Sequence, residues 1–170
     1  MEDAATGEAT ARPMAFVDID GVLADVRHRL HFIERRPRDW DGFFAAAIDD
    51  PAHPEGLALV ETLAAEHEIV FLTGRPRRCE ADTERWLTEH GIGGHQVVMR
   101  PERDRRPAAT VKLELLRRLA RGRVVAVIVD DDADVVRAMG AAGYPTFRAT
   151  WEGRSDDDEL SVAQDELGRT

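Results

Sequence analysis

Five short apolar segments recur through the middle of the chain, and they predict five β-strands. The segments span residues 14–19, 68–73, 96–99, 124–129 and 144–149. The first, second and fourth are almost continuously apolar, as is typical of parallel strands that are covered on both faces. Between the strands, apolar residues recur at helical spacing in residues 57–64, 77–90, 108–121 and 132–142. Strands that alternate with helices predict an α/β fold with a parallel sheet and right-handed crossovers.

One segment breaks this alternation, directly after the first predicted strand. Residues 25–56 contain two additional helical patterns, 26–35 and 40–48, before the next crossover helix begins. The second pattern has an aromatic face, and a run of turn-forming residues ends it. An insertion at this place in the chain is positioned to cover a site at the carboxyl end of the first strand. We therefore predict a small helical cap.

The length of the chain and the distribution of its charges predict one domain with acidic ends. The chain has 170 residues, of which 43% are hydrophobic, so one domain with a substantial core is expected. The formal net charge is −10, but residues 152–170 alone hold seven acidic residues against two arginines. We expect 14–151 to be the folded core, and 1–13 and 152–170 to be flexible acidic tails. The net charge therefore excludes no anionic substrate.

Several features favour a cytoplasmic protein. The single cysteine, Cys79, cannot form an internal disulfide, which fits a reducing compartment. No apolar run approaches the roughly 20 residues that a membrane span needs. Residues 1–13 lack the basic and apolar regions of a secretory signal. We expect no membrane partner, and the sequence does not indicate an oligomeric state.

Reactive side chains follow three of the predicted strands. In open α/β sheets, the site lies outside the carboxyl ends of the strands, where the strand order reverses. A lysine near the start of the helix at 108–121 belongs to the same edge of the sheet. The residues that this edge would bring together are Asp18, Asp20, Thr73, Gly74, Arg75, Lys112, Asp130 and Asp131.

The chemistry of this set points to a metal and a phosphate. Carboxylates a few ångströms apart repel one another, so such a group calls for a cation. A set of oxygen ligands without histidine or cysteine selects Mg²⁺. Thr73, Gly74 and Lys112 would supply a hydroxyl, a backbone N–H and an ammonium group to phosphate oxygens. An aspartate can also attack phosphorus and form an aspartyl phosphate.

The order Asp18-x-Asp20-Gly21-Val22, Thr73-Gly74-Arg75, Lys112 and Asp130-Asp131 resembles the four motifs of the haloacid dehalogenase (HAD) superfamily. The resemblance implies a three-layer Rossmann-like core with strand order 5-4-1-2-3. It implies that Asp18 is the nucleophile, that Asp20 is the general acid and then the base, and that Thr73 and Lys112 hold the phosphoryl group. The implied Mg²⁺ ligands are Asp18, the Asp20 carbonyl and Asp130, assisted by Asp131, with Asp132 and Asp134 as alternatives.

A second resemblance is more specific. The segment Met99-Arg100 to Lys112 is similar to the stretch before the lysine in the phosphatase domain of phage polynucleotide kinase-phosphatase. It implies further substrate-binding residues, namely Arg75, Arg100, Asp104 and Arg106. Two positions depart from that pattern, because Asp132 replaces a basic residue and alanines replace the acids before the lysine. No phosphate-binding loop of the kinase type occurs in the sequence.

These features predict a Mg²⁺-dependent phosphomonoesterase that acts through an aspartyl-phosphate intermediate. We expect its substrate to be a nucleotide or the 3′-phosphate end of a nucleic acid. Segment 100–123 holds nine basic residues against three acidic ones, so it is either a solvated helix face or a rim that guides an anionic substrate. A phosphatase for small metabolites is the alternative, and a phosphate-binding domain without turnover is a third possibility.

Overall fold

The computed structural model describes residues 11–153, and it confirms the predicted α/β fold. The sheet has five strands in the order β3-β2-β1-β4-β5, and every neighbouring pair is parallel. This is the order 5-4-1-2-3 that the family resemblance implies. The strands are β1 (Met14–Val17), β2 (Glu68–Pro76), β3 (Gln96–Arg100), β4 (Val125–Asp130) and β5 (Thr146–Arg148).

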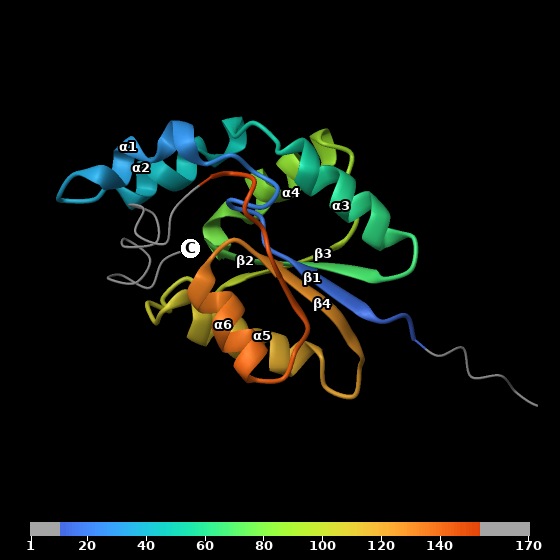
Figure 1. The fold of residues 1–170 in the computed structure, drawn as a ribbon. Helices are drawn as coiled ribbons and strands as arrows, with labels where there is room; N and C mark the ends of the chain where they lie inside the picture. The colour runs from blue at the N-terminus through green and yellow to red at the C-terminus, as the bar shows by residue number, and fades with distance from the viewer. Residues whose placement is uncertain (1–10, 154–170) are drawn as a thin grey trace, which may run out of the picture.

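Helices cover both faces of the sheet and make a three-layer structure (Figure 1). Alternate residues of β1 face opposite sides, because successive side chains of a strand point in opposite directions. Ala15 and Val17 belong to the core beneath one helix pair, and Met14 and Phe16 belong to the core beneath the other. Burial on both sides explains why the strand is continuously apolar. The first pair is α3 (Pro54–Ala64) and α4 (Glu80–Glu89), and the second is α5 (Ala108–Leu119) and α6 (Ala133–Ala141).

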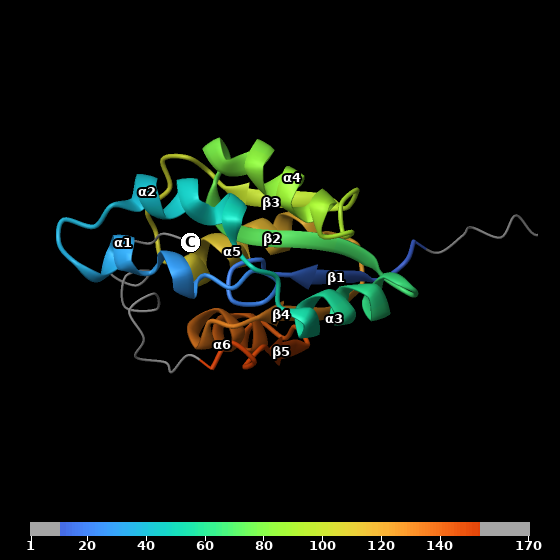
Figure 2. The same ribbon diagram turned by 90° about the horizontal axis from the view of Figure 1, so that it is seen from above.

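The predicted insertion forms a small helical layer beyond the carboxyl ends of β1 and β2 (Figure 2). Its aromatic residues Trp40, Phe43 and Phe44 pack together in a third core. Trp86 of α4 fastens the insertion to the helical layer, because its Nε1 donates a hydrogen bond of 2.8 Å to the Asp50 carbonyl. The helices of the insertion are η1 (Arg27–Arg29), α1 (His31–Glu34), α2 (Trp40–Ala45) and η2 (Ala46–Asp49).

The end of the core differs from the prediction at Glu152. We expected this residue to begin a solvated tail, but it is buried, and its Oε1 accepts a hydrogen bond of 3.0 Å from the Val26 N–H. The chain after β5 therefore packs against the start of the insertion. Most of the other residues that we predicted as tails, 1–10 and 154–170, lie outside the described residues. None of the helices within 11–153 is long and apolar enough to cross a membrane.

Candidate active site

The loop after β1 is tightly hydrogen-bonded, and it sets the positions of Asp18 and Asp20. The Asp18 N–H donates to the carbonyl of Val129 in β4 at 2.9 Å, so Asp18 is held level with the end of that strand. The carbonyl of Ile19 accepts hydrogen bonds from three consecutive backbone N–H groups, which closes the loop. Gly21 has a φ of +78°, a conformation that favours glycine. Both aspartates are buried at the carboxyl edge of the sheet.

Three elements bring a lysine and three carboxylates together at this edge. The Lys112 Nζ, from the second turn of α5, lies 2.8 Å from Asp18 Oδ2 and 2.8 Å from Asp130 Oδ2. One carboxylate oxygen from each of Asp18, Asp130 and Asp131 lies within 4.8 Å of the other two. Of the candidates after β4, Asp131 is the one that joins this cluster. Asp132 instead caps α6, because its side chain accepts the N–H groups of the first helical turn.

The charges of this cluster leave a requirement for a cation. Burial raises the pKa of Asp18 to about 7, although the nearby Lys112 favours the ionised form. Burial disfavours the charge of Lys112 as well, but Asp130 and Asp18 outweigh it and raise the pKa of the lysine. The second carboxylate oxygen of Asp18 is buried and has no hydrogen-bond partner among residues 11–153. An oxygen-only donor set with an unsatisfied carboxylate oxygen fits Mg²⁺.

A second buried network surrounds Asp20. Its Oδ1 accepts hydrogen bonds from Arg75 at 2.6 and 3.0 Å and from Arg29 at 2.7 Å. The same two arginines also bind Asp50, with contacts between 2.7 and 3.0 Å. The guanidinium of Arg29 lies over the ring of Phe43, 4.1 Å from its centroid. Two buried arginines and two buried aspartates therefore compensate one another inside the cap.

This network controls the charge of Asp20. Burial by itself would raise the pKa of Asp20, but Arg29 and Arg75 outweigh burial and hold the pKa well below its usual range. Both arginines bind the same oxygen, and the other oxygen, Oδ2, is buried without a hydrogen-bond partner in the part of the chain that the structure describes. Asp20 is thus an anchored carboxylate with one oxygen available for further contacts.

Sequence reasoning missed two members of this network, Arg29 and Asp50. Arg29 lies in a basic run at the start of the insertion, and Asp50 precedes a proline in what reads as a turn. Such patterns are typical of exposed residues, yet both side chains are buried. A local signal was not present, because their compensating charges come from segments that are distant in the sequence.

Three further predicted site residues lie at the end of β3 and on the loop that leads to α5, with contacts other than those we expected. Arg100 is buried, and its guanidinium donates to the carbonyls of Gly74, Asp104 and Arg106 at distances between 2.8 and 3.3 Å. We expected Arg100 to face the mouth of the site, but its side chain instead holds the loop in place. Arg106 is half-exposed and forms ion pairs with Asp104 at 2.6 Å and with Glu114 at 2.8 Å.

Two residues from the end of β2 complete the edge. Thr73 is buried, and its Oγ1 accepts the N–H of Arg75 at 3.2 Å. The side chain of Arg75 points into the network around Asp20, where we expected it to reach a group beside the scissile phosphate. The structure therefore brings Asp18, Lys112, Asp130 and Asp131 into one cluster. Arg75 instead binds Asp20 and Asp50, and Arg100 binds backbone carbonyls of the neighbouring loops.

Comparison with known families decides the classification. The polynucleotide kinase PNKP phosphatase domain matches this chain over residues 13–152. The chain belongs to this family. It is also 31% identical over 133 residues to a protein of Autographa californica nuclear polyhedrosis virus named "Putative bifunctional polynucleotide kinase/RNA ligase". That match covers 76% of this chain and 18% of the viral protein, so the PNKP phosphatase domain corresponds to a small part of that relative.

Solved structures share the fold. A chain in the structure of a Pnkp1/Rnl/Hen1 complex superposes with a TM-score of 0.67 at 22% identity, covering 82% of this chain and 45% of that one. A haloacid dehalogenase-like hydrolase from Streptococcus pneumoniae superposes with a TM-score of 0.61 at 15% identity, covering 90% of this chain and 91% of that one. These structures show the fold, and the family match shows that the protein contains a HAD-type phosphatase domain, as the sequence predicted.

Proposed function

We propose that this PNKP phosphatase domain hydrolyses phosphate monoesters through an aspartyl phosphate on Asp18, and that its substrate is the 3′-phosphate end of a polynucleotide or a nucleotide. The observation that carries the mechanism is the buried Asp18 carboxylate. Lys112 holds one of its oxygens, and the other accepts no hydrogen bond from any described residue. A positioned carboxylate oxygen beside a buried cation suits a nucleophile that attacks phosphorus.

In the first step, the unpartnered oxygen of Asp18 forms a bond to phosphorus as the bond to the ester oxygen breaks. Lys112 neutralises the charge on the transferring oxygens, and Thr73 and the Gly74 N–H orient them. A Mg²⁺ ion, for which Asp18, Asp130, Asp131 and the Asp20 carbonyl are the proposed ligands, would supply further charge neutralisation when bound. In the second step, water attacks phosphorus and releases phosphate and the free Asp18 carboxylate.

Asp20 moves the proton in both steps. Its proposed role is to donate a proton to the departing ester oxygen from Oδ2 and then to take a proton from the attacking water. The two arginines keep Asp20 ionised at rest. The phosphate brings negative charge close to Asp20, which favours its protonated form, so the carboxylate acquires its proton together with the substrate. The arginines anchor Oδ1 throughout, and this keeps Oδ2 oriented.

Hydrolysis of p-nitrophenyl phosphate with and without Mg²⁺ tests the mechanism. We expect Asp18→Asn to lose activity by several orders of magnitude, because an amide is no nucleophile. Asp82→Asn, on the exposed face of α4, is the matched control and should keep full activity. A wild-type protein that binds phosphate and Mg²⁺ without turnover would instead favour the phosphate-binding domain, and a tenth of wild-type activity in Asp18→Asn would exclude the covalent step.

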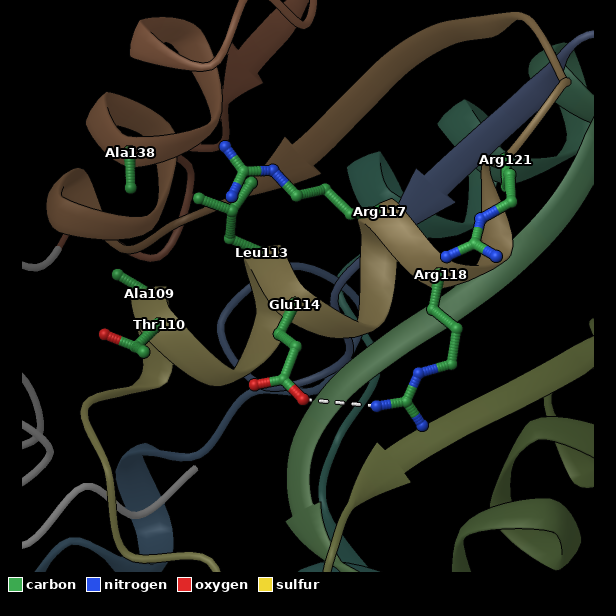
Figure 3. Close-up of a pocket in the computed structure, with 8 residues that line it drawn as sticks. All are labelled: Ala109, Thr110, Leu113, Glu114, Arg117, Arg118, Arg121 and Ala138. Carbon is green, nitrogen blue, oxygen red and sulfur yellow. Dashed lines mark hydrogen bonds and ion pairs between the residues drawn. The ribbon is translucent and has the colours of Figure 1, made fainter.

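The polynucleotide assignment is supported by the family and by a basic groove on α5. Figure 3 shows that Arg117 and Arg118 come from the carboxyl-terminal half of this helix and that Arg121 follows its end. The groove has a volume of about 530 Å³ and extends to Ala138 of α6. Arg118 pairs with Glu114, whereas no ion pair of Arg117 or Arg121 is recorded among residues 11–153. Arginines in these positions suit the phosphates of a strand that runs from the active site along α5 toward its carboxyl-terminal end.

A comparison of two substrates tests this assignment. We expect Arg117→Ala and Arg121→Ala to raise the KM for a 3′-phosphorylated oligonucleotide at low salt. Each should also lower the salt dependence of binding by about one unit of slope or slightly less. Hydrolysis of p-nitrophenyl phosphate should not change, and neither should the behaviour of Arg85→Ala on α4. Equal use of sugar phosphates and oligonucleotides, without a salt slope, would favour the metabolite phosphatase and leave the mechanism intact.

A further inference from the structure

Three side chains of the kinds that bind metal ions lie together at the base of the insertion, apart from the active-site cluster. They are Asp25, His53 and Glu152, and their potential ligand atoms all lie within 4.8 Å of one another. Asp25 lies where the chain enters the insertion, and His53 lies where it leaves. Glu152 belongs to the chain after β5. None of the three belongs to the Asp18 cluster, so this site has its own residues and its own position in the fold.

The geometry of the group suits a tetrahedral ion. His53 Nε2 and Glu152 Oε1 are 3.3 Å apart, and both side chains are buried. Tetrahedral Zn²⁺ with bonds of about 2.0–2.1 Å separates neighbouring ligand atoms by roughly 3.3 Å. The Val26 N–H donates to the same Glu152 oxygen at 3.0 Å, which orients the carboxylate as outer hydrogen bonds orient metal ligands.

Asp25 would be the third ligand of such an ion. Its carboxylate has an ion pair with Arg27, whose side chain is largely exposed. Arg27 binds both carboxylate oxygens, and its backbone N–H donates to Oδ1 at 3.0 Å, so a metal ion at this site would replace or share the contacts of the exposed guanidinium. One imidazole and two carboxylates differ from the oxygen-only set at Asp18, because imidazole nitrogen favours Zn²⁺ and similar transition metals over Mg²⁺.

We propose that Asp25, His53 and Glu152 form a second metal site for Zn²⁺ or a similar transition-metal ion. The backbone shows what the ion would hold together. The Asp25 N–H donates to the Pro51 carbonyl and the His53 N–H donates to the Leu23 carbonyl, both at 2.8 Å, so the two connections of the insertion run side by side. An ion at this place ties both connections to the segment after β5. It acts as a clamp on the cap, and it does not depend on the proposed phosphatase mechanism.

Binding of Zn²⁺ and Co²⁺ to the full chain tests the proposal, with Mg²⁺ in large excess to occupy the oxygen-only cluster. We expect the wild-type protein to bind one equivalent of Zn²⁺ by calorimetry and to gain a higher melting temperature. Co²⁺ in the same site should give the visible absorption of a tetrahedral ion. His53→Gln and Glu152→Gln should each weaken Zn²⁺ binding by more than about 100-fold. Loss of a residue that only hydrogen-bonds to a metal ligand weakens binding by about 10–100-fold, and loss of the ligand itself should weaken it more.

Two controls distinguish this site from other ligands of the chain. Asp130→Asn, in the active-site cluster, and His95→Gln, between α4 and β3, should keep the stoichiometry and the Co²⁺ spectrum of the wild type. If one ligand variant does not fold, the other ligand variant and the wild-type measurements still test the proposal. Absence of Zn²⁺ and Co²⁺ binding in the presence of Mg²⁺ would overturn the proposal. Wild-type affinity in folded His53→Gln, or loss of the spectrum in Asp130→Asn, would overturn it as well.

Discussion

Replacement of Asp18 by asparagine should stabilise the metal-free protein at the same time as it stops hydrolysis. The Asp18 carboxylate is buried beside Asp130, and both depend on the single ammonium group of Lys112. Without a metal ion, this cluster holds more negative than positive charge. Asparagine has nearly the same shape as the neutral acid, so the substitution removes the charge without a cavity, and Lys112 can then compensate Asp130 alone.

The pKa of Asp18 sets the magnitude. Burial raises it from 3.8 to about 7, and one pKa unit corresponds to about 1.4 kcal/mol. Between these pH values the folded protein binds more protons than the unfolded chain, so stability falls as the pH rises from about 4 to about 7. Ionisation of Asp18 therefore lowers the free energy of unfolding of the wild type by roughly 4 kcal/mol at pH 8 and by roughly 2 kcal/mol at pH 5. The asparagine variant should regain these amounts, which are large against the ~5–15 kcal/mol of an ordinary domain.

Urea denaturation in the presence of EDTA, at pH 5 and pH 8, measures this gain. The difference between variant and wild type cancels the titration of groups that both proteins share. Asp82→Asn on α4 should show almost no difference, since its ion pair is exposed. Addition of Mg²⁺ should stabilise the wild type and have a smaller effect on Asp18→Asn. An asparagine variant that is no more stable at pH 8, or equally stabilised at both pH values, would refute the electrostatic reasoning.

Three further predictions concern Asp20, Arg29 and Gly56. Asp20→Asn should slow the hydrolysis of an alkyl phosphate by roughly 10²–10⁴-fold and that of p-nitrophenyl phosphate much less, because the p-nitrophenolate leaving group needs no proton. Equal losses in kcat for the two substrates would exclude Asp20 as the general acid. Arg29→Met leaves two buried carboxylates under-compensated, so urea denaturation should show a loss of about 3–5 kcal/mol, and unchanged stability would contradict the network. Gly56→Ala would place Cβ 2.1 Å from the Val22 carbonyl oxygen and should cost about 1–3 kcal/mol, whereas Gly140→Ala, with 3.8 Å to its nearest neighbour, should not destabilise α6.

The parallel sheet and the active-site cluster follow from patterns that are local in the sequence. A strand covered on both faces must be apolar along its whole length, so 14–19, 68–73 and 124–129 could be recognised without the structure. Parallel strands then bring their carboxyl ends to one edge, which places Asp18 and Asp130 at the same edge of the sheet. The order of the strands was implied by the family motifs, since periodicity does not determine which strands are neighbours.

Only the tertiary structure decided which charged side chains are buried. Arg29 contacts Asp20 and Asp50, which are 9 and 21 positions away, and Arg75 contacts Asp20 across 55 positions. Each residue by itself resembles an exposed charge, because a buried ion needs compensation and its partners come from separate segments. The same reason explains Glu152, which reads as part of an acidic tail but meets the Val26 N–H across 126 positions. The sequence determined which groups can react, and the packing of the insertion on the sheet determined their charge states and their supports.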